Sequence, residues 1–368
     1  MKTILLISPY WREDHRWMVS SVKLAELWQR LGYRVVVACM GSETSMEVVS
    51  PMLTIHRRRD VFLPDPLNFG IAFGFTGFLR RIVREERPDR IVFCKVLFWT
   101  SFAAIPLRLR GYSFDIVTDA LVGITWKPRS FIPKIIMGIG GWTVGWLVLL
   151  SAQRIVFYHP QPQRILRILG IAKKSRVIPT GIDPKPFGHS ALVTRNSITI
   201  TYVGRLESVK GVDDFLAAAE PLLRDHHDVR LRVAGWFAPG NPLVERYKNS
   251  VEFTGLVNDV RPIYASTDIF VLPSYSEGLS NALMEAMASG CACIASDVGG
   301  NRYLIQNGVS GFLFPAGDRE ALRSFIRKLI EDPAKRKAMG EAARKRIEEH
   351  FSWDKVGEMY QDFLSNAL

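Results

Sequence analysis

Short apolar runs, rich in Val and Ile, alternate with amphipathic segments along most of the chain. The runs have the length of buried strands, and the segments between them repeat apolar residues at helical spacing. Strands are predicted at residues 4–8, 34–38, 90–93, 114–118, 154–158, 198–203, 229–234, 251–254, 269–273 and 291–296. Helices are predicted at residues 18–31, 77–86, 102–110, 212–225, 282–288 and 319–330. This alternation is typical of parallel sheets with right-handed crossovers, so we expect an α/β fold with two doubly wound, Rossmann-like domains.

A boundary between the two domains is predicted at residues 178–186. Three prolines and one glycine within these nine residues interrupt regular structure, and polar residues continue as far as Ser197. A chain of 368 residues has room for two domains that each bury a core. We therefore predict an N-terminal domain over residues 1–178 and a C-terminal domain over residues 179–351.

Residues 135–153 carry no charge, and their length approaches the roughly 20 residues of a membrane span. Four glycines, a threonine and a glutamine make the segment less apolar than most spans, and a span would divide the N-terminal domain. A core helix and a helix at a membrane interface are the two other interpretations. Trp142, Trp146 and neighbouring bases such as Lys134 suit an interface, where amphipathic rings and cations meet lipid headgroups. A second aromatic stretch, residues 62–78, is also followed by two arginines.

The positive charge of the chain is concentrated in its first half. Residues 1–184 contain 26 Lys and Arg against 13 Asp and Glu, whereas residues 185–368 contain 22 against 23. The excess indicates an anionic partner of the N-terminal domain or a solvated basic surface. No nucleic-acid recognition motif accompanies it, so we expect no nucleic acid and favour an anionic membrane surface.

Composition adds three expectations. An apolar fraction of 48% and a charged fraction of 23% are ordinary for a globular protein, and no long disordered stretch is expected. The cysteines lie in apolar runs without metal-ligand spacing, which predicts buried free thiols in a reducing cytoplasm. The first apolar run is too short for the core of a secretory signal.

Residues 274–290 form the strongest functional motif. A predicted strand ends just before them, and ligands of open α/β sheets bind beyond the carboxyl ends of strands. Gly278 lets a ligand approach the backbone, and Ser280 is a plausible cap for the following helix, whose free N–H groups suit anionic or hydroxyl-rich groups. Glu277 can accept hydrogen bonds from sugar hydroxyls, and Glu285, on the helix, is suited to the two hydroxyls of a ribose. Either glutamate alone would be read as a surface residue.

A second motif follows an earlier strand at Gly204. Arg205 offers a planar fork to phosphate oxygens, and Lys210 offers a mobile point charge. Two cations beyond a strand suit a diphosphate leaving group. No Asp-x-Asp metal motif occurs in the chain, so we expect the cations to replace a divalent metal and expect neither metal nor cofactor. The alternative is a solvated basic loop.

With these motifs in their order along the chain, the second half resembles glycosyltransferase family 4, retaining enzymes of the two-domain GT-B fold. The resemblance rests on residues 180–183, 204–211, 253–257, 277–285, 298–300 and 307–312. It implies two domains that face a central cleft, with a C-terminal helix, residues 352–368, that packs back on the N-terminal domain.

The resemblance also implies roles for individual residues. Arg205 and Lys210 would bind the donor diphosphate beside Gly204, Glu285 the ribose, and Val257 would contact the base. Glu277 would hold the donor sugar together with the backbone of four residues. These four are Gly278, Leu279, Ser280 and Asn281.

The N-terminal half matches the family less well. The loop at residues 8–17 has bulky and charged residues where the family has a glycine pair, so it is expected to shape the acceptor pocket instead. His15 in this loop is one candidate for a catalytic base. The histidine that the family places after a strand is absent, and Asp119 falls at or beside its position. Asp119 is therefore our catalytic candidate together with Glu277, and the alternative is a structural aspartate that caps a turn.

These observations predict a retaining transferase that moves a sugar from a UDP- or GDP-sugar to an acceptor hydroxyl. The acceptor is expected to be a lipid-linked or membrane-associated saccharide in cell-surface polysaccharide or glycolipid synthesis, with the enzyme at the inner face of the membrane. The alternatives are a soluble acceptor, an epimerase of similar shape, and a degenerate subunit that only binds a sugar nucleotide.

Overall fold

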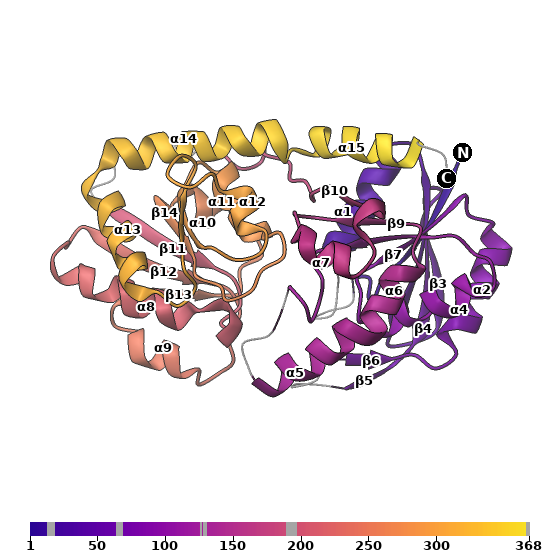
Figure 1. Ribbon diagram of the computed structural model, residues 1–368. Helices are drawn as coiled ribbons and strands as arrows, with labels where there is room; N and C mark the ends of the chain where they lie inside the picture. Colours follow the sequence, from indigo (N-terminus) through magenta and orange to yellow (C-terminus); the bar gives the residue numbers. More distant parts are fainter. Residues whose placement is uncertain (13–18, 64–68, 126, 128–130, 189–196, 366–368) are drawn as a thin grey trace. The chain divides into compact units, whose positions relative to one another are not determined.

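The chain forms two compact units in the computed structural model (Figure 1). The structure describes residues 1–12, 19–63, 69–125, 127, 131–188 and 197–365. Unit 1 comprises residues 1–127, 132–180 and 357–368, and unit 2 comprises residues 128–131 and 181–356.

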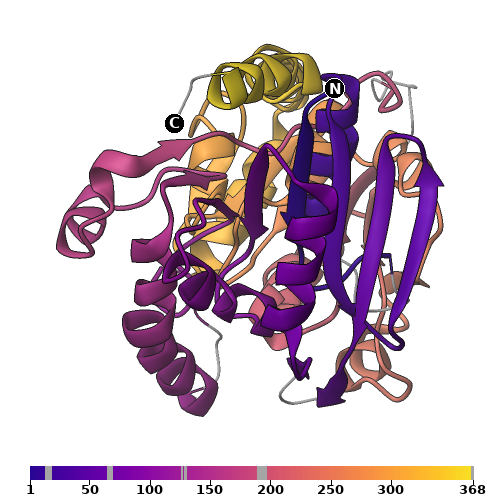
Figure 2. The same cartoon turned by 90° about the vertical axis from the view of Figure 1, so that its right-hand side faces the viewer.

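Unit 1 is built on an eight-stranded sheet in the order β10-β9-β8-β7-β1-β2-β4-β3. All neighbouring strands are parallel except β3 and β4, which form an antiparallel hairpin at one edge (Figure 2). The chain starts at β1 in the middle of the sheet, adds β2 and β4 on one side and β7 to β10 on the other. The strands are β1 (Thr3–Ile7), β2 (Arg34–Gly41), β3 (Ser45–Ser50), β4 (Leu53–Arg59), β7 (Arg90–Cys94), β8 (Asp115–Thr118), β9 (Arg154–Phe157) and β10 (Ser175–Val177).

The central strands of this sheet are apolar because both of their faces are covered. β1 is buried at every position, and β8 likewise. A separate two-stranded ribbon pairs β5 (Val61–Leu63) with β6 (Phe69–Ile71). The helices of this unit are α1 (Val19–Arg30), α2 (Phe75–Glu86), α3 (Trp99–Phe102), α4 (Ala104–Arg108), α5 (Phe131–Gly140), α6 (Trp146–Ser151) and α7 (Gln163–Ile168).

The helix predicted at residues 102–110 is in fact two short helices, α3 and α4. Pro106 has no N–H to donate to the carbonyl of Phe102, so the helical hydrogen-bond ladder is interrupted between them. The strands β3 and β4 were not predicted, because β3 is largely exposed and lacks an apolar run.

Unit 2 contains a six-stranded parallel sheet in the order β13-β12-β11-β14-β15-β16. The chain enters at β11, winds through β12 and β13 to one edge, and then returns to β14 on the other side of β11. The topological switch point of this sheet therefore lies between β11 and β14. The strands are β11 (Ile198–Val203), β12 (Val229–Ala234), β13 (Val251–Gly255), β14 (Ile269–Leu272), β15 (Ala292–Ser296) and β16 (Phe312–Phe314).

Helices cover this sheet, with α8 packed against α13 and α11 against α14. The helix predicted at 212–225 changes to a 3₁₀ helix after Ala219, where Pro221 cannot continue the α-helical ladder. α14 was not predicted, since it is polar on most of its surface. The helices are α8 (Val212–Ala219), α9 (Pro242–Tyr247), α10 (Arg261–Ala265), α11 (Asn281–Ala288), α12 (Asn301–Leu304), α13 (Arg319–Glu331) and α14 (Pro333–His350).

The last helix, α15 (Trp353–Ser365), joins unit 1 from Gly357 onward. Tyr360 packs edge-on against Trp28 of α1, with ring centroids 6.2 Å apart. Arg154 stacks over the ring of Phe363, 3.9 Å from its centroid, and donates a hydrogen bond of 2.7 Å to its carbonyl oxygen. The C-terminal half of α15 is thus part of the core of unit 1.

Candidate functional site

Two loops meet at the switch point of unit 2. Because β11 and β14 are neighbours, the loops that follow them leave the sheet side by side. Lys210 Nζ, in the first loop, donates a hydrogen bond of 2.8 Å to Glu277 Oε1 in the second. Ser274 Oγ donates to the same oxygen over 2.6 Å. The two motifs found in the sequence are thus joined by an ion pair.

Close backbone packing holds the loop that carries Glu277. The N–H of Gly300 donates to the carbonyl oxygen of Gly278 over 2.9 Å. A β-carbon at Gly299 would collide with the carbonyl of Glu277, and Gly299 has a φ of 46°, which favours glycine. The glycine pair at residues 299–300 therefore shapes the loop that carries Glu277.

The helix α11 begins directly after this loop. Ser280 accepts a hydrogen bond of 3.3 Å at its Oγ from the N–H of Leu283, and is the cap that the sequence predicted. Leu279 is buried beneath the loop, and Asn281 is half-buried at the first position of the helix. The backbone of Gly278–Asn281 thus turns from the end of the sheet into a capped helix start.

Glu285 lies one turn further along α11. Tyr264 donates a hydrogen bond of 3.0 Å from its hydroxyl to Glu285 Oε2. Burial, and then the charge of Glu285, raise the pKa of Tyr264 well above its usual range, so the phenol stays protonated and remains a donor. Sequence reasoning missed Tyr264, which fixes the orientation of the glutamate expected to hold a ribose.

Arg205 follows Gly204, the first residue after β11. The guanidinium of Arg205 lies 2.8 Å from the carboxylate of Glu207. It is largely exposed, so it is accessible to an anion. The loop is anchored from below by the buried Tyr202, whose hydroxyl donates to the carbonyl of Arg205 over 2.9 Å. A β-carbon at Gly204 would strike this hydroxyl, which explains the glycine.

Val257 is half-buried just beyond β13, on the carboxyl-end side of the same sheet. Two apolar side chains near the same strand ends are exposed, Leu256 at 75% and Trp236 at 51%. The carbonyl of Trp236 accepts a hydrogen bond of 3.1 Å from the N–H of Leu206 in the loop after β11. Sequence reasoning missed Trp236, although an aromatic residue directly after a strand and a glycine was a visible signal.

Unit 1 brings Asp119 together with a residue that the sequence did not single out. Lys95, the first residue after β7, donates a hydrogen bond from Nζ to Oδ2 of Asp119, which follows the neighbouring strand β8. The ammonium also lies 5.8 Å from the ring centroid of Tyr158. Lys95 is largely buried, whereas Asp119 keeps about a third of its side chain exposed, 35%.

The backbone near Lys95 is strained. Lys95 has a φ of 78° and Leu97 a φ of 64°, in a region that costs residues with a β-carbon about 1–2 kcal/mol each. Strain of this kind persists where the surrounding structure enforces it, and it clusters at functional sites. The signal available in the sequence was the position of Lys95 directly beyond a buried strand.

The loop after β1 is described only in part. Tyr10 and Trp11 are buried, and the Tyr10 hydroxyl donates to Asp60 Oδ2 over 2.6 Å. These two aromatic side chains therefore pack in the core of unit 1. Arg12 is exposed and pairs with Glu26 over 3.0 Å. His15 and the rest of the loop to Trp17 lie outside the described residues.

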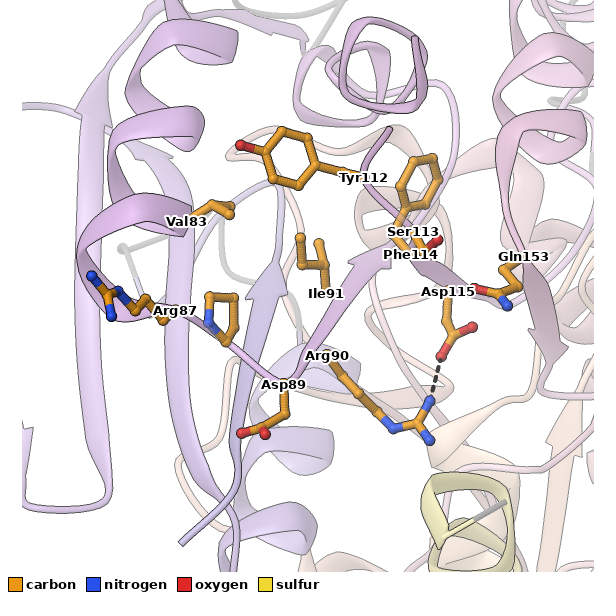
Figure 3. Close-up of a pocket in the computed structure, with 11 residues that line it drawn as sticks. Val83, Arg87, Asp89, Arg90, Ile91, Tyr112, Ser113, Phe114, Asp115 and Gln153 are labelled. Atoms are coloured by element: carbon orange, nitrogen blue, oxygen red, sulfur yellow. Dashed lines mark ion pairs between the residues drawn. The ribbon is translucent and has the colours of Figure 1, made fainter. Parts of the chain in front are cut away.

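A pocket of about 290 Å³ lies elsewhere in unit 1, beside the starts of β7 and β8 (Figure 3). One of its lining residues, Asp115, is paired with arginines. Asp115 binds Arg154 over 2.6 Å and lies 3.6 Å from Arg90. Because ligands of parallel sheets bind at the opposite, carboxyl ends of the strands, this pocket is not the site built by the motifs.

Among the residues that the structure describes, no group of three or more His, Cys, Asp or Glu side chains is arranged to hold a metal ion. The positive charge near the switch point of unit 2 comes from Arg205 and Lys210. The expectation that these cations take the place of a metal stays a prediction.

Comparison with known families matches both halves of the chain. Residues 19–185 match the family described as "Glycosyltransferase Family 4", and residues 197–332 match "Glycosyl transferases group 1". The second match contains every residue that was expected to bind the donor.

Two curated relatives are similar over part of their length. A capsular polysaccharide biosynthesis glycosyltransferase, CapM, from Staphylococcus aureus is 30% identical over 182 residues, which is 47% of this chain and 48% of CapM. A UDP-Gal:alpha-D-GlcNAc-diphosphoundecaprenol alpha-1,3-galactosyltransferase from Escherichia coli is 29% identical over 250 residues, 60% of this chain and 64% of that protein. The matched segments thus span about half to two thirds of these relatives.

Solved structures match the whole chain. Sucrose-phosphate synthase from Thermosynechococcus elongatus superposes with a TM-score of 0.81 at 21% identity and covers 100% of both chains. HepE from Anabaena, solved with UDP-glucose, gives a TM-score of 0.73 at 17% identity and covers 99% of this chain and 100% of its own. At these identities the likeness concerns the fold, two parallel-sheet Rossmann-like domains.

Proposed function

Since the chain belongs to the group 1 and family 4 glycosyltransferases and has the GT-B fold, we propose that it transfers a hexose from a UDP- or GDP-sugar to an acceptor hydroxyl with retention of configuration. The proposed donor site is the switch point of unit 2. The proposed acceptor is a lipid-linked or membrane-associated saccharide of a cell-surface polysaccharide or glycolipid pathway, reached from the inner face of the membrane.

The ion pair between Lys210 and Glu277 is the observation that carries the donor assignment. The cation proposed to bind the diphosphate and the carboxylate proposed to bind the sugar hydroxyls are joined by one hydrogen bond. The leaving diphosphate and the transferred sugar would therefore be held side by side. Glu285, oriented by Tyr264, is suited to the two hydroxyls of a ribose. HepE, of the same fold, was solved with UDP-glucose, which supports this class of donor.

The proposed chemistry needs no strong protein base. The bond between the anomeric carbon and the diphosphate oxygen breaks, and its electron pair leaves with the diphosphate toward Lys210 and Arg205. The acceptor hydroxyl oxygen forms the new bond on the same face of the sugar, and its proton passes to the departing phosphate oxygen. Asp119 is proposed to hold the donor sugar or to polarise the acceptor hydroxyl, and Lys95 to hold Asp119 in place.

The acceptor class is supported by the names of the relatives and by the surface of unit 1. One relative is named for capsular polysaccharide synthesis and another for transfer to a diphosphoundecaprenol-linked sugar. The N-terminal half of this chain carries the excess positive charge that an anionic lipid surface would attract. A soluble acceptor is the alternative, and sucrose-phosphate synthase has the same fold.

Transfer of label tests the proposal. Purified protein is incubated with a panel of radiolabelled nucleotide sugars and a membrane lipid extract, and the products are divided between organic and aqueous phases. Label in the organic phase is the expected result and identifies the donor. Label only in a water-soluble product would replace the lipid-linked acceptor with a soluble one. No turnover of any donor would reject the transferase and favour a degenerate binding subunit.

A further inference from the structure

The helical rod formed by α5, a π-helical turn (Gly141–Gly145) and α6 runs along one side of unit 1 (Figures 1 and 2). It contains all but the last two residues of the uncharged stretch 135–153. Residues Lys134–Ser151 are long and apolar enough to cross a membrane, but only 22% of them are buried inside the protein. Most of the segment is therefore not a core helix, although Val148 and Leu149 of α6 are buried in the core of unit 1.

The rod cannot cross a membrane while the sheet of unit 1 is intact. β8 precedes the rod and β9 follows it, and these two strands are parallel, hydrogen-bonded neighbours, with Asp115 opposite Arg154. A span would put the two strands on opposite sides of the bilayer and break the sheet. The rod must therefore return to the side of the membrane from which it starts.

The rod faces the protein with glycines and, in α6, with the buried side chains of Val148 and Leu149. A β-carbon at Gly141 would come within 2.6 Å of the carbonyl oxygen of Val122, and one at Gly145 within 3.2 Å of the Leu97 side chain. Close backbone packing against the body of unit 1 thus uses the small residues of the rod. A helix of a soluble domain normally turns its large apolar residues inward.

The solvent side of the rod carries most of its large apolar residues. Ile136 is 62% exposed and Ile139 is 63% exposed. The tryptophans at 142 and 146 are also partly exposed, and Trp146 is anchored through a 3.0 Å hydrogen bond from its ring N–H to the carbonyl of Leu169. The exposed large apolar side chains between residues 135 and 150 are Ile135, Ile136, Ile139, Trp142, Val144, Trp146, Leu147 and Leu150.

Neighbouring elements continue this surface with apolar and basic side chains. Leu109 follows α4, which packs against α6, and Ile168 lies in α7. Lys174 Nζ donates to the carbonyls of Leu150 and Ala152 at the end of α6, over 2.7 Å each. Burial, and then the nearby charge of Arg108, lower the pKa of Lys174. The exposed bases on these elements are Arg108, Arg110, Lys134, Arg164, Arg167 and Lys173.

Charge selects the partner. Between Asp119 and Asp183 the sequence contains nine Lys and Arg and no Asp or Glu. An apolar face with an entirely basic segment around it complements a surface that is apolar inside and anionic outside, which describes an acidic phospholipid bilayer. A second copy of this chain would bring the same positive charge and be repelled.

We propose that the solvent side of α5–α6, with Leu109 and Ile168, is the surface through which unit 1 lies on an anionic membrane, its apolar side chains among the acyl chains and its bases at the headgroups. This inference deepens the proposed function and rests on it only for the acceptor. It gives the enzyme a fixed attachment in the same unit that carries Asp119.

Vesicle flotation of the full-length protein tests the surface. Phosphatidylcholine vesicles are compared with vesicles that also contain phosphatidylglycerol, at low and high salt. The wild type is expected to float with the anionic vesicles. The I136D/I139D variant is expected to bind them about tenfold or more weakly. Salt should weaken binding, because the Debye length falls to about 3 Å at 1 M salt.

M46D/V48D is the matched control, since Met46 and Val48 on β3 are each 63% exposed in the same unit and the variant receives the same two new charges. It should float as the wild type does. Equal binding by I136D/I139D and wild type, or no binding of the wild type to anionic vesicles, would overturn the proposal. A lipid-free dimer that I136D/I139D dissociates would also overturn it and assign the face to a second copy.

A second measurement does not depend on the folding of the aspartate variant. W142F keeps an apolar side chain and removes one indole, so brominated lipids should quench less of its tryptophan fluorescence than that of the wild type. Equal fractional quenching would contradict the proposed depth of Trp142. UDP and GDP binding, measured without vesicles, separates the proposed donor site from the proposed membrane surface. Nucleotide binding without flotation would support the donor site and reject the membrane surface. Flotation without nucleotide binding would support the membrane surface and reject the donor site.

Discussion

Lys210 donates a hydrogen bond of 2.8 Å to Glu277, although 67 positions separate the two residues in the sequence. They meet because β11 and β14, which precede them, flank the switch point of one sheet. In the proposed reaction the lysine must serve two partners, the carboxylate at rest and the diphosphate when the donor is bound. A donor phosphate that draws Lys210 away would free Glu277 for the sugar.

We expect K210M to lower kcat by about 100-fold, because one cation near a developing charge contributes that much in a water-excluded site. E277Q should also lower kcat, since the hydroxyls of the donor sugar lose a negatively charged hydrogen-bond acceptor. Steady-state kinetics of the labelled transfer assay measure both. K345M is the control, because Lys345 is exposed on α14 and pairs with Glu349 of the same helix. Wild-type kcat in K210M would reject the role of Lys210.

The carboxylate of Glu285 is expected to set nucleotide affinity. E285Q should raise the Kd of the nucleotide about tenfold or more, because a hydrogen bond to a charged group contributes about 1.5–3 kcal/mol. Y264F should have a smaller effect in the same direction, because it only releases Glu285 from its 3.0 Å hydrogen bond. Calorimetric titration with UDP and GDP measures both changes. An E285Q protein that binds as tightly as the wild type would argue against a ribose contact.

Replacement of Lys95 is expected to act on turnover and not on donor binding. K95M removes the partner of Asp119, so kcat should fall about tenfold or more while the Kd of the nucleotide, whose proposed site lies in unit 2, stays unchanged. K95R keeps a positive charge at the same backbone position and should restore part of the rate. Thermal unfolding of each variant identifies simple loss of folding. An unchanged kcat in folded K95M would show that the pair of Lys95 and Asp119 is a structural contact without a role in turnover.

Chelation is expected to leave transfer unaffected. Arg205 and Lys210 supply positive charge where a divalent ion would otherwise neutralise the diphosphate. The measurement compares initial rates with and without EDTA, followed by addition of Mg²⁺ or Mn²⁺. A rate that falls with EDTA and returns with either ion would show that the two cations are insufficient.

The four cysteines are expected to resist alkylation in the folded protein. Cys39, Cys94, Cys291 and Cys293 are buried free thiols. Burial raises the pKa of Cys94, Cys291 and Cys293, so the reactive thiolate is scarce at neutral pH. Iodoacetamide labelling followed by mass spectrometry should find little modification until denaturant is added. Rapid labelling of one native cysteine would reveal an opening of its domain.

The sequence predicted the elements whose residues are uniformly apolar or clearly periodic. The strands β1, β7, β8, β11 and β14 and the helix α11 appear within one residue of their predicted positions, because full burial requires continuous apolar runs. β3 and α14 were missed because an exposed edge strand and a mostly polar helix leave no such pattern. The breaks at Pro106 and Pro221 were missed although the residues themselves were visible.

By itself, the sequence determined the two α/β units, the family and the residues of the donor motifs, since these depend on local pattern and on short spacings. The tertiary structure alone decided that Lys95 pairs with Asp119, that Tyr264 orients Glu285, and that the 135–153 segment faces solvent with most of its large residues. Local pattern gives the hydrophobicity of a helix but not the direction of each face, because that direction depends on which side chains the rest of the fold can accommodate. A β-carbon at Gly141 would collide with the carbonyl of Val122 and one at Gly145 would be tightly packed, whereas the exposed isoleucines of α5 meet no such neighbour.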